Sequence, residues 1–319
     1  MFVVGAPKSG TTSLYEYLAG HPDVFMSPVK EPMYFAPDMR GGPRRRFEYR
    51  VDEAQYMSLF AGARDQKTIG EASTRYLASH AAPRLVREFE PQARIVIMLR
   101  NPVEMIHALH NERVSFGTEE ITDFEEALAA DADRAAGRRL RQGADPLWAV
   151  YRNKARFGEQ VARWIDKFER ERVHVIIFDD FADDTPGEYR KLLEFLDVDP
   201  SYQPASYAAR RKSHRRRGGL LRAMVQSPAA RWAVHRLLPA VFGRTRSARL
   251  VWRFRQSRLN LKAAPRQPIR PELRRQLEAE FAPDIAQLSS ILERDLVQLW
   301  FGRPAQAEGA AGRALLTVA

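Results

Sequence analysis

The stretch of residues 2–18, FVVGAPKSGTTSLYEYL, constrains the fold more than any other part of the chain. Its opening apolar residues are typical of a buried strand, and the glycine and proline that follow cannot continue that strand. Apolar residues with helical spacing begin at Leu14. Three hydroxyl residues just before it are suited to cap a helix: Thr11, Thr12 and Ser13. The stretch therefore predicts a strand, a glycine loop and a helix in direct succession.

The glycine loop is suited to bind a phosphate group. Gly5 and Gly10 have the spacing of the two glycines in a Walker A loop. Walker A places its lysine directly after the second glycine, whereas this chain has Lys8 inside the loop. Backbone N–H groups around a helix N-terminus bind phosphate. We therefore expect an anion site with Lys8 as its cation; a generic turn with incidental glycines is the plain alternative.

Residues 5–35, GAPKSGTTSLYEYLAGHPDVFMSPVKEPMYF, resemble the opening of sulfotransferases that use 3′-phosphoadenosine 5′-phosphosulfate (PAPS). The resemblance returns at residues 94–115 and is weaker elsewhere. It implies that Lys8 takes part in catalysis and that the loop binds the 5′-phosphosulfate of the donor. The donor-binding residues that it implies are Lys8, Ser9, Gly10, Thr11, Thr12 and Ser13. It also implies an acceptor hydroxyl on a carbohydrate, a glycolipid or a small natural product.

Glu31 is the candidate for the catalytic base. In carbohydrate-type members of this family, a glutamate in a Glu-x-x-(Tyr/His/Phe)-Phe context is the base, and Glu31 matches that position. A surface Lys30–Glu31 ion pair is the plain alternative. His110 is the reserve candidate, because another branch of the family uses a histidine, although a structural histidine is the commoner role on a helix.

A second segment, residues 94–110, resembles the part of the family that binds the 3′-phosphate of the donor. Arg100 follows an almost entirely apolar strand and can bind a phosphate through two hydrogen bonds. A structural ion pair is the alternative for Arg100. The family usually has a serine eight residues later, where this chain has Ala108. We expect His107, Asn111 or a basic region to compensate.

The segment after residues 67–71 is a candidate acceptor site. These residues have the composition of a strand, and ligands of open α/β sheets bind at the carboxyl ends of strands. Glu71 and Thr74 are therefore candidate acceptor contacts. Related glycan enzymes often carry a lysine just after this glutamate, where this chain has Ala72. Arg75 is a candidate to replace it.

The order of strands and helices predicts the fold class. Strands alternate with long helices, which favours a parallel sheet, and four strands can be named: residues 2–5, 67–71, 94–99 and 173–178. We expect an α/β, P-loop-like three-layer fold with a central, mostly parallel sheet flanked by helices. Asp179 and Asp180 after the last strand are interpreted as a capping and turn element. Residues 271–300 predict two helices that pack onto the sheet.

One domain is expected for residues 1–302, followed by a flexible Ala/Gly-rich tail at 303–319. The chain has no cysteine, which excludes thiolate metal sites and a cysteine nucleophile. No His-Glu-x-x-His pattern occurs, so no metal is predicted. No signal peptide is evident, and no apolar run approaches the roughly 18 residues of a membrane span. A cytoplasmic protein is the expectation.

The positive charge is concentrated in a basic region, defined as residues 201–271. This region holds 18 of the 51 Lys and Arg residues and none of the 40 acidic ones, although the net charge of the whole chain is +11. It implies an anionic partner: the donor nucleotide, an anionic acceptor, nucleic acid or a membrane surface. Its first part resembles in position the basic loop that the family places near the 3′-phosphate, so Lys212 and Arg215 are donor-binding candidates. A solvated basic face is the alternative.

The resemblance leads to one predicted reaction and two alternatives. The prediction is metal-free sulfuryl transfer from PAPS, with Glu31 as base, Lys8 stabilising the leaving group and no nucleic-acid partner. The first alternative is a P-loop kinase or NTPase, which the position of Lys8 disfavours. The second is a non-enzymatic protein that binds nucleic acid or an anionic surface through the basic region. Aromatic residues there are few, Trp232 and Trp252 among them, which gives a stacking platform little support.

Overall fold

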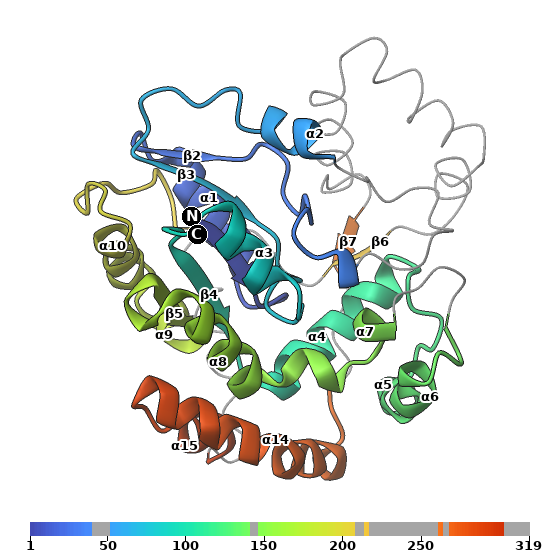
Figure 1. The fold of residues 1–319 in the computed structure, drawn as a ribbon. Coiled ribbons are helices and arrows are strands. Elements are labelled where there is room, and N and C mark those ends of the chain that lie inside the picture. The colour runs from blue at the N-terminus through green and yellow to red at the C-terminus, as the bar shows by residue number, and fades with distance from the viewer. Residues whose placement is uncertain (40–51, 141–145, 208–213, 217–260, 264–267, 303–319) are drawn as a thin grey trace.

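A single five-stranded parallel sheet, in the order β2-β3-β1-β4-β5, forms the centre of the computed structural model (Figure 1). The structure describes residues 1–39, 52–140, 146–207, 214–216, 261–263 and 268–302. The strands are β1 (Phe2–Gly5), β2 (Val24–Met26), β3 (Thr68–Ala72), β4 (Ile95–Leu99) and β5 (Val173–Ile177). The four predicted strands are confirmed to within one residue at each end, and β2 adds an edge strand.

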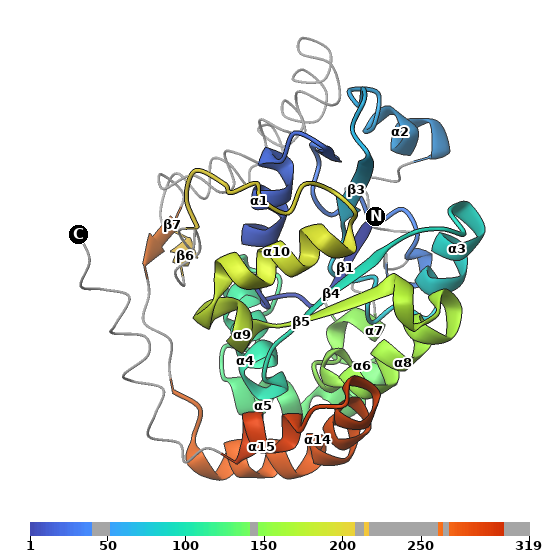
Figure 2. The ribbon, with the colours of Figure 1, turned by 90° about the vertical axis from the view of Figure 1, so that its left-hand side faces the viewer.

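Helices cover both faces of the sheet, which explains why β4 is buried along its whole length. Successive side chains point to opposite faces, so Phe2 and Val4 join one apolar cluster while Val3 joins another. Figure 2 shows α1 (Thr11–Gly20) and α10 (Thr185–Phe195) on one side of the sheet. It shows α3 (Ala82–Phe89) and α8 (Phe157–Phe168) on the other. The predicted three-layer α/β fold is confirmed.

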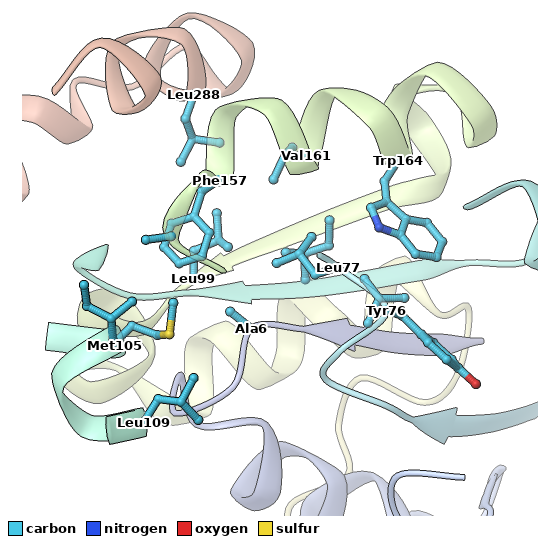
Figure 3. Packing of buried hydrophobic residues seen from close by; sticks show 14 of the residues in the cluster. Ala6, Tyr76, Leu77, Leu99, Met105, Leu109, Phe157, Val161, Trp164 and Leu288 are labelled. Atoms are coloured by element: carbon cyan, nitrogen blue, oxygen red, sulfur yellow. The ribbon is translucent and has the colours of Figure 1, made fainter. Parts of the chain in front are cut away.

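The larger apolar cluster lies between the sheet and α8 (Figure 3). Phe157, Val161 and Trp164 of α8 are completely buried there. Burial of each large apolar side chain contributes about 1.5–3 kcal/mol. Leu288, which belongs to α14 (Pro271–Leu292), points toward Phe157 near the start of α8.

The C-terminal helices, α14 and α15 (Leu296–Phe301), confirm the two helices predicted for residues 271–300. The prediction that they pack onto the sheet is wrong for α14. It packs on α8 and also contacts α4 (Pro102–Ser115), so these helices separate it from the strands. Figure 1 shows α14 and α15 together at the outer edge of the molecule.

The remaining elements are short. The helices are α2 (Glu53–Ser58), α5 (Phe124–Ala129), α6 (Asp131–Ala135), α7 (Pro146–Ala149) and α9 (Phe178–Asp183), with 3₁₀ turns at Pro37–Met39, Arg152–Ala155 and Arg170–Arg172. Two further strands, β6 (His214–Arg216) and β7 (Leu261–Ala263), form an antiparallel pair, and β6 lies beside α4. The predicted tail and most of the basic region lie outside the described residues. In the described part of the chain, none of the helices combines the length and apolar character that crossing a membrane requires.

Gly5 allows two segments to meet closely at the end of β1. A Cβ at this position would lie 2.5 Å from Leu77 Cβ and 3.2 Å from the Thr74 carbonyl oxygen. The Leu77 N–H donates to the Val4 carbonyl over 2.8 Å, which keeps the segment after β3 in place. A side chain at residue 5 would push apart the segment after β3 and the loop after β1.

Candidate active site

The candidate site lies at the carboxyl ends of three neighbouring strands. β1 pairs with β3 on one side and with β4 on the other, and all three are parallel. The glycine loop follows β1, the segment of Thr74 follows β3, and Arg100 follows β4. Because parallel strands end at the same edge of a sheet, these three segments adjoin one another.

Gly10 begins the helix that follows the glycine loop. It has a φ of 92° and occupies the N-cap of α1, where none of the side chains described supplies a cap hydrogen bond. The predicted caps at Thr11, Thr12 and Ser13 are therefore wrong, since these residues form the first turn of α1 itself. Thr12 and Ser13 are half-buried there, and Thr11 and Ser9 are buried. A helix start without a side-chain cap leaves its first N–H groups for an anion.

Lys8 is held by an acidic partner that sequence reasoning missed. Its Nζ donates to Glu112 Oε1 over 2.9 Å, and both side chains are half-buried. Glu112 lies on α4, so the ion pair joins the loop after β1 to the helix after β4. Lys8 has a φ of 62°, a left-handed conformation that costs a non-glycine residue about 1 kcal/mol or more. The surrounding structure therefore holds this lysine in an unusual conformation.

One aromatic ring, that of Phe178, links Arg100 to the same loop. The Arg100 guanidinium lies 5.0 Å from the centre of the Phe178 ring. A Cβ on Gly10 would meet that ring at 3.2 Å, so Phe178 contacts both of the predicted donor-binding elements. Phe178 directly follows β5 and was not predicted as a site residue. Ala108, where the family usually has a serine, is buried in α4.

Of the two donor-binding candidates in the basic region, only Arg215 lies in the part of the chain that the structure describes. Lys212 lies outside the described residues. Arg215 lies in β6, which contacts α4, the helix that carries Glu112. The structure describes only the backbone of this residue, so its role stays a prediction.

Hydrogen bonds of the backbone and of the carboxylate fix the position of Glu31. Its N–H donates to the Ala72 carbonyl over 2.9 Å, which places Glu31 at the end of β3. The Thr74 N–H and the Thr74 hydroxyl each donate to one carboxylate oxygen over 2.9 Å. Lys30 Nζ lies 3.3 Å from Oε1, so the predicted Lys30–Glu31 pair also exists. Glu31 shares with Lys8 the left-handed conformation, with a φ of 63°.

Glu71 is not an acceptor contact, and that prediction is wrong. Its side chain is buried, and three hydroxyls donate to its carboxylate: Ser73 over 2.7 Å, Tyr76 over 2.8 Å and Tyr56 over 3.4 Å. Burial raises the pKa of Glu71 to about 7, although the hydrogen bonds from Ser73, Tyr76 and Tyr56 oppose this rise. The nearby charge of Glu31 raises it further.

The Glu71 hydrogen bonds support the segment that carries Glu31. Ser73 Oγ, which donates to Glu71, accepts from the N–H of Met33 over 3.1 Å. Tyr76 Oη, a second donor to Glu71, accepts from the N–H of Phe35 over 3.1 Å. Buried Glu71 therefore helps to fix the backbone just after Glu31, because the Ser73 and Tyr76 hydroxyls that donate to Glu71 also accept hydrogen bonds from that backbone.

Arg75, the candidate replacement for the missing lysine, contacts α7. Its guanidinium lies 4.4 Å from the centre of the Trp148 ring, and Nη1 donates to the Met39 carbonyl over 3.4 Å. Thr74, the other predicted acceptor contact at this strand end, holds Glu31.

His110 has the setting of a core histidine. It is buried, its Nε2 lies 2.9 Å from the Ile121 carbonyl oxygen, and its ring packs against Phe124 and Tyr151. Burial lowers the pKa of His110, which the Ile121 hydrogen bond partly opposes. The structural alternative is favoured over catalysis. His107 is buried as well and also packs against Phe124.

Asp179 and Asp180 bind the C-terminal helices. They lie in the first turn of α9, where Asp179 accepts a hydrogen bond from Trp300 Nε1 over 3.0 Å and Asp180 pairs with Arg294. The interpretation as a capping and turn element is wrong, because both residues lie within α9, whose N-cap is Ile177 and has no side-chain cap hydrogen bond. Across the described ranges, no group of three or more His, Asp or Glu side chains is arranged to hold a metal ion.

Comparison with known proteins gives consistent matches. The profile of the sulfotransferase family matches residues 1–203. Carbohydrate sulfotransferase 15 of Homo sapiens is 26% identical over 256 residues, covering 62% of this chain and 44% of that protein. Heparan sulfate glucosamine 3-O-sulfotransferase 6 of Homo sapiens is 25% identical over 199 residues, covering 61% of this chain and 51% of that protein. The chain thus spans about half the length of these two relatives.

A solved structure covers more of the chain. A sulfotransferase from Alicyclobacillus acidocaldarius is 30% identical, with a TM-score of 0.68, and the match covers 94% of this chain and 97% of that one. The family profile alone matches well over half of the sequence, and it includes the loop after β1, Glu31 and Arg100. The chain belongs to the sulfotransferase family.

Proposed function

We propose that this protein transfers a sulfuryl group from PAPS to a hydroxyl group of a carbohydrate. The observation that carries the proposal is the placement of Lys8 and Glu31 at the carboxyl ends of two adjoining strands. Lys8 lies in the loop after β1, and Glu31 is bound to the end of β3, which pairs with β1. A cation for the donor and a base for the acceptor therefore share one edge of the sheet.

The glycine loop fits the 5′-phosphosulfate of the donor. The uncapped N-terminus of α1 offers backbone N–H groups, and Thr12 and Ser13 lie in its first turn. Lys8 supplies the positive charge that the phosphate requires, which is why the proposal needs no metal ion. Arg100, at the end of β4, is the candidate for the 3′-phosphate because a guanidinium can bind it with two hydrogen bonds.

The reaction follows from these positions. Glu31 accepts the proton of the acceptor hydroxyl while the hydroxyl oxygen forms a bond to sulfur. The bond between sulfur and the phosphate oxygen breaks, and that oxygen takes the electron pair. Lys8 and the loop N–H groups stabilise the charge that develops on the leaving 3′-phosphoadenosine 5′-phosphate (PAP). Thr74 orients the Glu31 carboxylate through its two hydrogen bonds.

The acceptor class rests on the relatives. Two of them have names that refer to a carbohydrate and to heparan sulfate, and Glu31 stands in the context expected for a carbohydrate-type base. A glycolipid or a small natural product would present the same hydroxyl chemistry. Cytoplasmic location, the absence of a nucleic-acid partner and contact of the basic region with a membrane stay predictions, which cell fractionation, salt-dependent DNA binding and vesicle binding would test.

The deciding experiment is calorimetric titration with PAP in the presence of EDTA, compared with magnesium-ATP. We expect tight binding of the bisphosphate without metal, followed by transfer of labelled sulfate from PAPS to members of a saccharide panel. Binding of magnesium-ATP without binding of PAP would favour the kinase or NTPase alternative. Transfer to a lipid or small-molecule hydroxyl but to no saccharide would keep the donor and overturn the acceptor class.

A further inference from the structure

Arg100 has an acidic neighbour that competes with any phosphate. Glu104 lies four residues further along the chain, in the first turn of α4, and its Oε2 is 3.7 Å from Arg100 Nη2. Both side chains are largely buried, with exposed fractions of 20% for Arg100 and 14% for Glu104. Partial burial strengthens an attraction between opposite charges, so a carboxylate at this place can neutralise the arginine.

A second arginine binds the same carboxylate from the other side. Arg274, near the start of α14, forms a hydrogen-bonded ion pair with Glu104 Oε1. Burial by itself would raise the pKa of Glu104, but the hydrogen bond and charge of Arg274, together with the charge of Arg100, hold it below its ordinary value. Glu104 is therefore an anion at neutral pH, and its shorter contact is to Arg274.

The C-terminal helices are attached at the same strand ends. Asn101 Nδ2, next to Arg100, donates to the Trp300 carbonyl over 2.9 Å. Trp300 Nε1 in turn donates to Asp179, the residue after Phe178. The contacts of α14 and α15 thus reach the residues that follow β4 and β5. Both helices lie beyond residues 1–203, the part that the family profile matches.

We propose that Arg274 is a positioning residue of the donor site, which engages Glu104 and so keeps Arg100 available for the 3′-phosphate. The two arginines share the Glu104 carboxylate, and Arg274 also lies 3.7 Å from Glu278 Oε1 on its own helix. Without Arg274, the Glu104 carboxylate pairs with Arg100 alone, and a phosphate that binds Arg100 must first displace this carboxylate. This inference rests on the proposed function, because it assumes a donor with a 3′-phosphate. It also assigns a role in the donor site to helices outside the matched segment.

The test compares two nucleotides on purified full-length variants. PAP and adenosine 5′-phosphate differ by the 3′-phosphate, so the ratio of their dissociation constants measures the contribution of that group. We expect Arg274→Gln to weaken PAP binding about tenfold and adenosine 5′-phosphate binding less than twofold. Arg275→Gln is the matched control, because Arg275 is exposed and pairs with Glu272 on the same helix; it should change neither.

The double variant Arg274→Gln/Glu104→Gln distinguishes this role from a structural one. Removing the competing carboxylate should return PAP binding to within about threefold of the original protein. Glu104→Gln alone should tighten PAP binding severalfold. This single variant still tests the proposal if Arg274→Gln does not fold, which thermal unfolding would reveal.

Three results would overturn the inference: equal weakening of both nucleotides by Arg274→Gln, no rescue in the double variant, or weaker PAP binding by Glu104→Gln. They differ from failure of the proposed function, in which the unsubstituted protein itself would not bind PAP.

Discussion

The donor side and the acceptor side of the site are built from different interactions. On the donor side, charged groups pair across separate elements: Lys8 with Glu112, and Arg100 with a carboxylate that Arg274 shares. On the acceptor side, the carboxylates are held mainly by neutral donors. Thr74 binds Glu31, and three hydroxyls bind Glu71.

The difference fits what each side has to bind in the proposed reaction. A doubly phosphorylated nucleotide brings several negative charges, so its cations must be present and must exchange their protein partners for phosphate. A base must keep an unprotonated carboxylate in a fixed direction, and neutral hydrogen-bond donors achieve this without neutralising it. Substitutions on the donor side should therefore change donor binding, alone or together with turnover, whereas those on the acceptor side should change turnover or stability and leave donor binding intact.

The largest expected effect is on the acceptor side. Glu31→Gln keeps the size of the side chain but removes the base, so we expect turnover to fall by about 10²–10⁴-fold. PAP affinity should change by less than about twofold, because in the proposed reaction Glu31 acts on the acceptor and not on the donor. Sulfate transfer under saturating donor and calorimetry of PAP would be measured together. Glu88→Gln, an exposed glutamate paired with Arg84, is the control. Retained turnover would remove Glu31 as the base.

A smaller but broader effect is expected for Lys8→Ala. We expect turnover to fall about 10²–10³-fold, since the charge on the leaving phosphate loses its cation. PAP affinity should fall as well, which distinguishes this variant from Glu31→Gln. Lys191→Ala, an exposed lysine paired with Glu188, controls for the loss of charge alone. An effect on turnover with unchanged PAP affinity would contradict the division between the two sides.

The smallest expected effect concerns stability. The pKa of Glu71 is about 7 in the folded protein, above its ordinary value of 4.5, so the folded state binds more protons than the unfolded state between these values. Stability from this group is present below pH 4.5 and is lost as the pH rises through 7. The loss amounts to about 3 kcal/mol at most.

Glu71→Gln should remove this contribution. Chemical unfolding at pH 5 and pH 8 would show that the variant loses less stability over this interval than the original protein. Comparing the two proteins cancels the contributions of other titrating groups to the pH dependence of stability. One such group is His174, whose pKa is lowered by burial to about 4. A pH dependence identical in both proteins would show that Glu71 does not titrate in this range.

The sequence located the residues of the proposed donor side better than those of the proposed acceptor side. Gly5, Lys8 and Gly10 lie in one continuous stretch, and Arg100 directly follows an apolar strand, so local pattern was sufficient to place them at the ends of β1 and β4. Glu71 was misplaced because its position at a strand end suggested access to ligand. Its burial depends on Tyr56, which lies on α2, and on Tyr76, which lies beyond the strand.

Other site residues carry no signal in the sequence. Glu112 and Glu104 are ordinary charges on a helix, and Phe178 is one apolar residue after an apolar strand. Arg274 is one of many arginines and lies far along the chain from Arg100. The wrong prediction that α14 packs on the sheet has the same cause, since an amphipathic pattern shows that one face is buried but not which partner covers it.

The sequence by itself determined the succession of strand, glycine loop and helix, the parallel α/β fold and the residue types that a sulfotransferase needs. These are local properties, because backbone conformation and apolar periodicity are set by neighbouring residues. Only the tertiary structure decided which charges share a partner: Lys8 with Glu112, and Glu104 between Arg100 and Arg274. Such pairs join distant segments, and their geometry depends on strand order and helix packing, which no short stretch of the chain encodes.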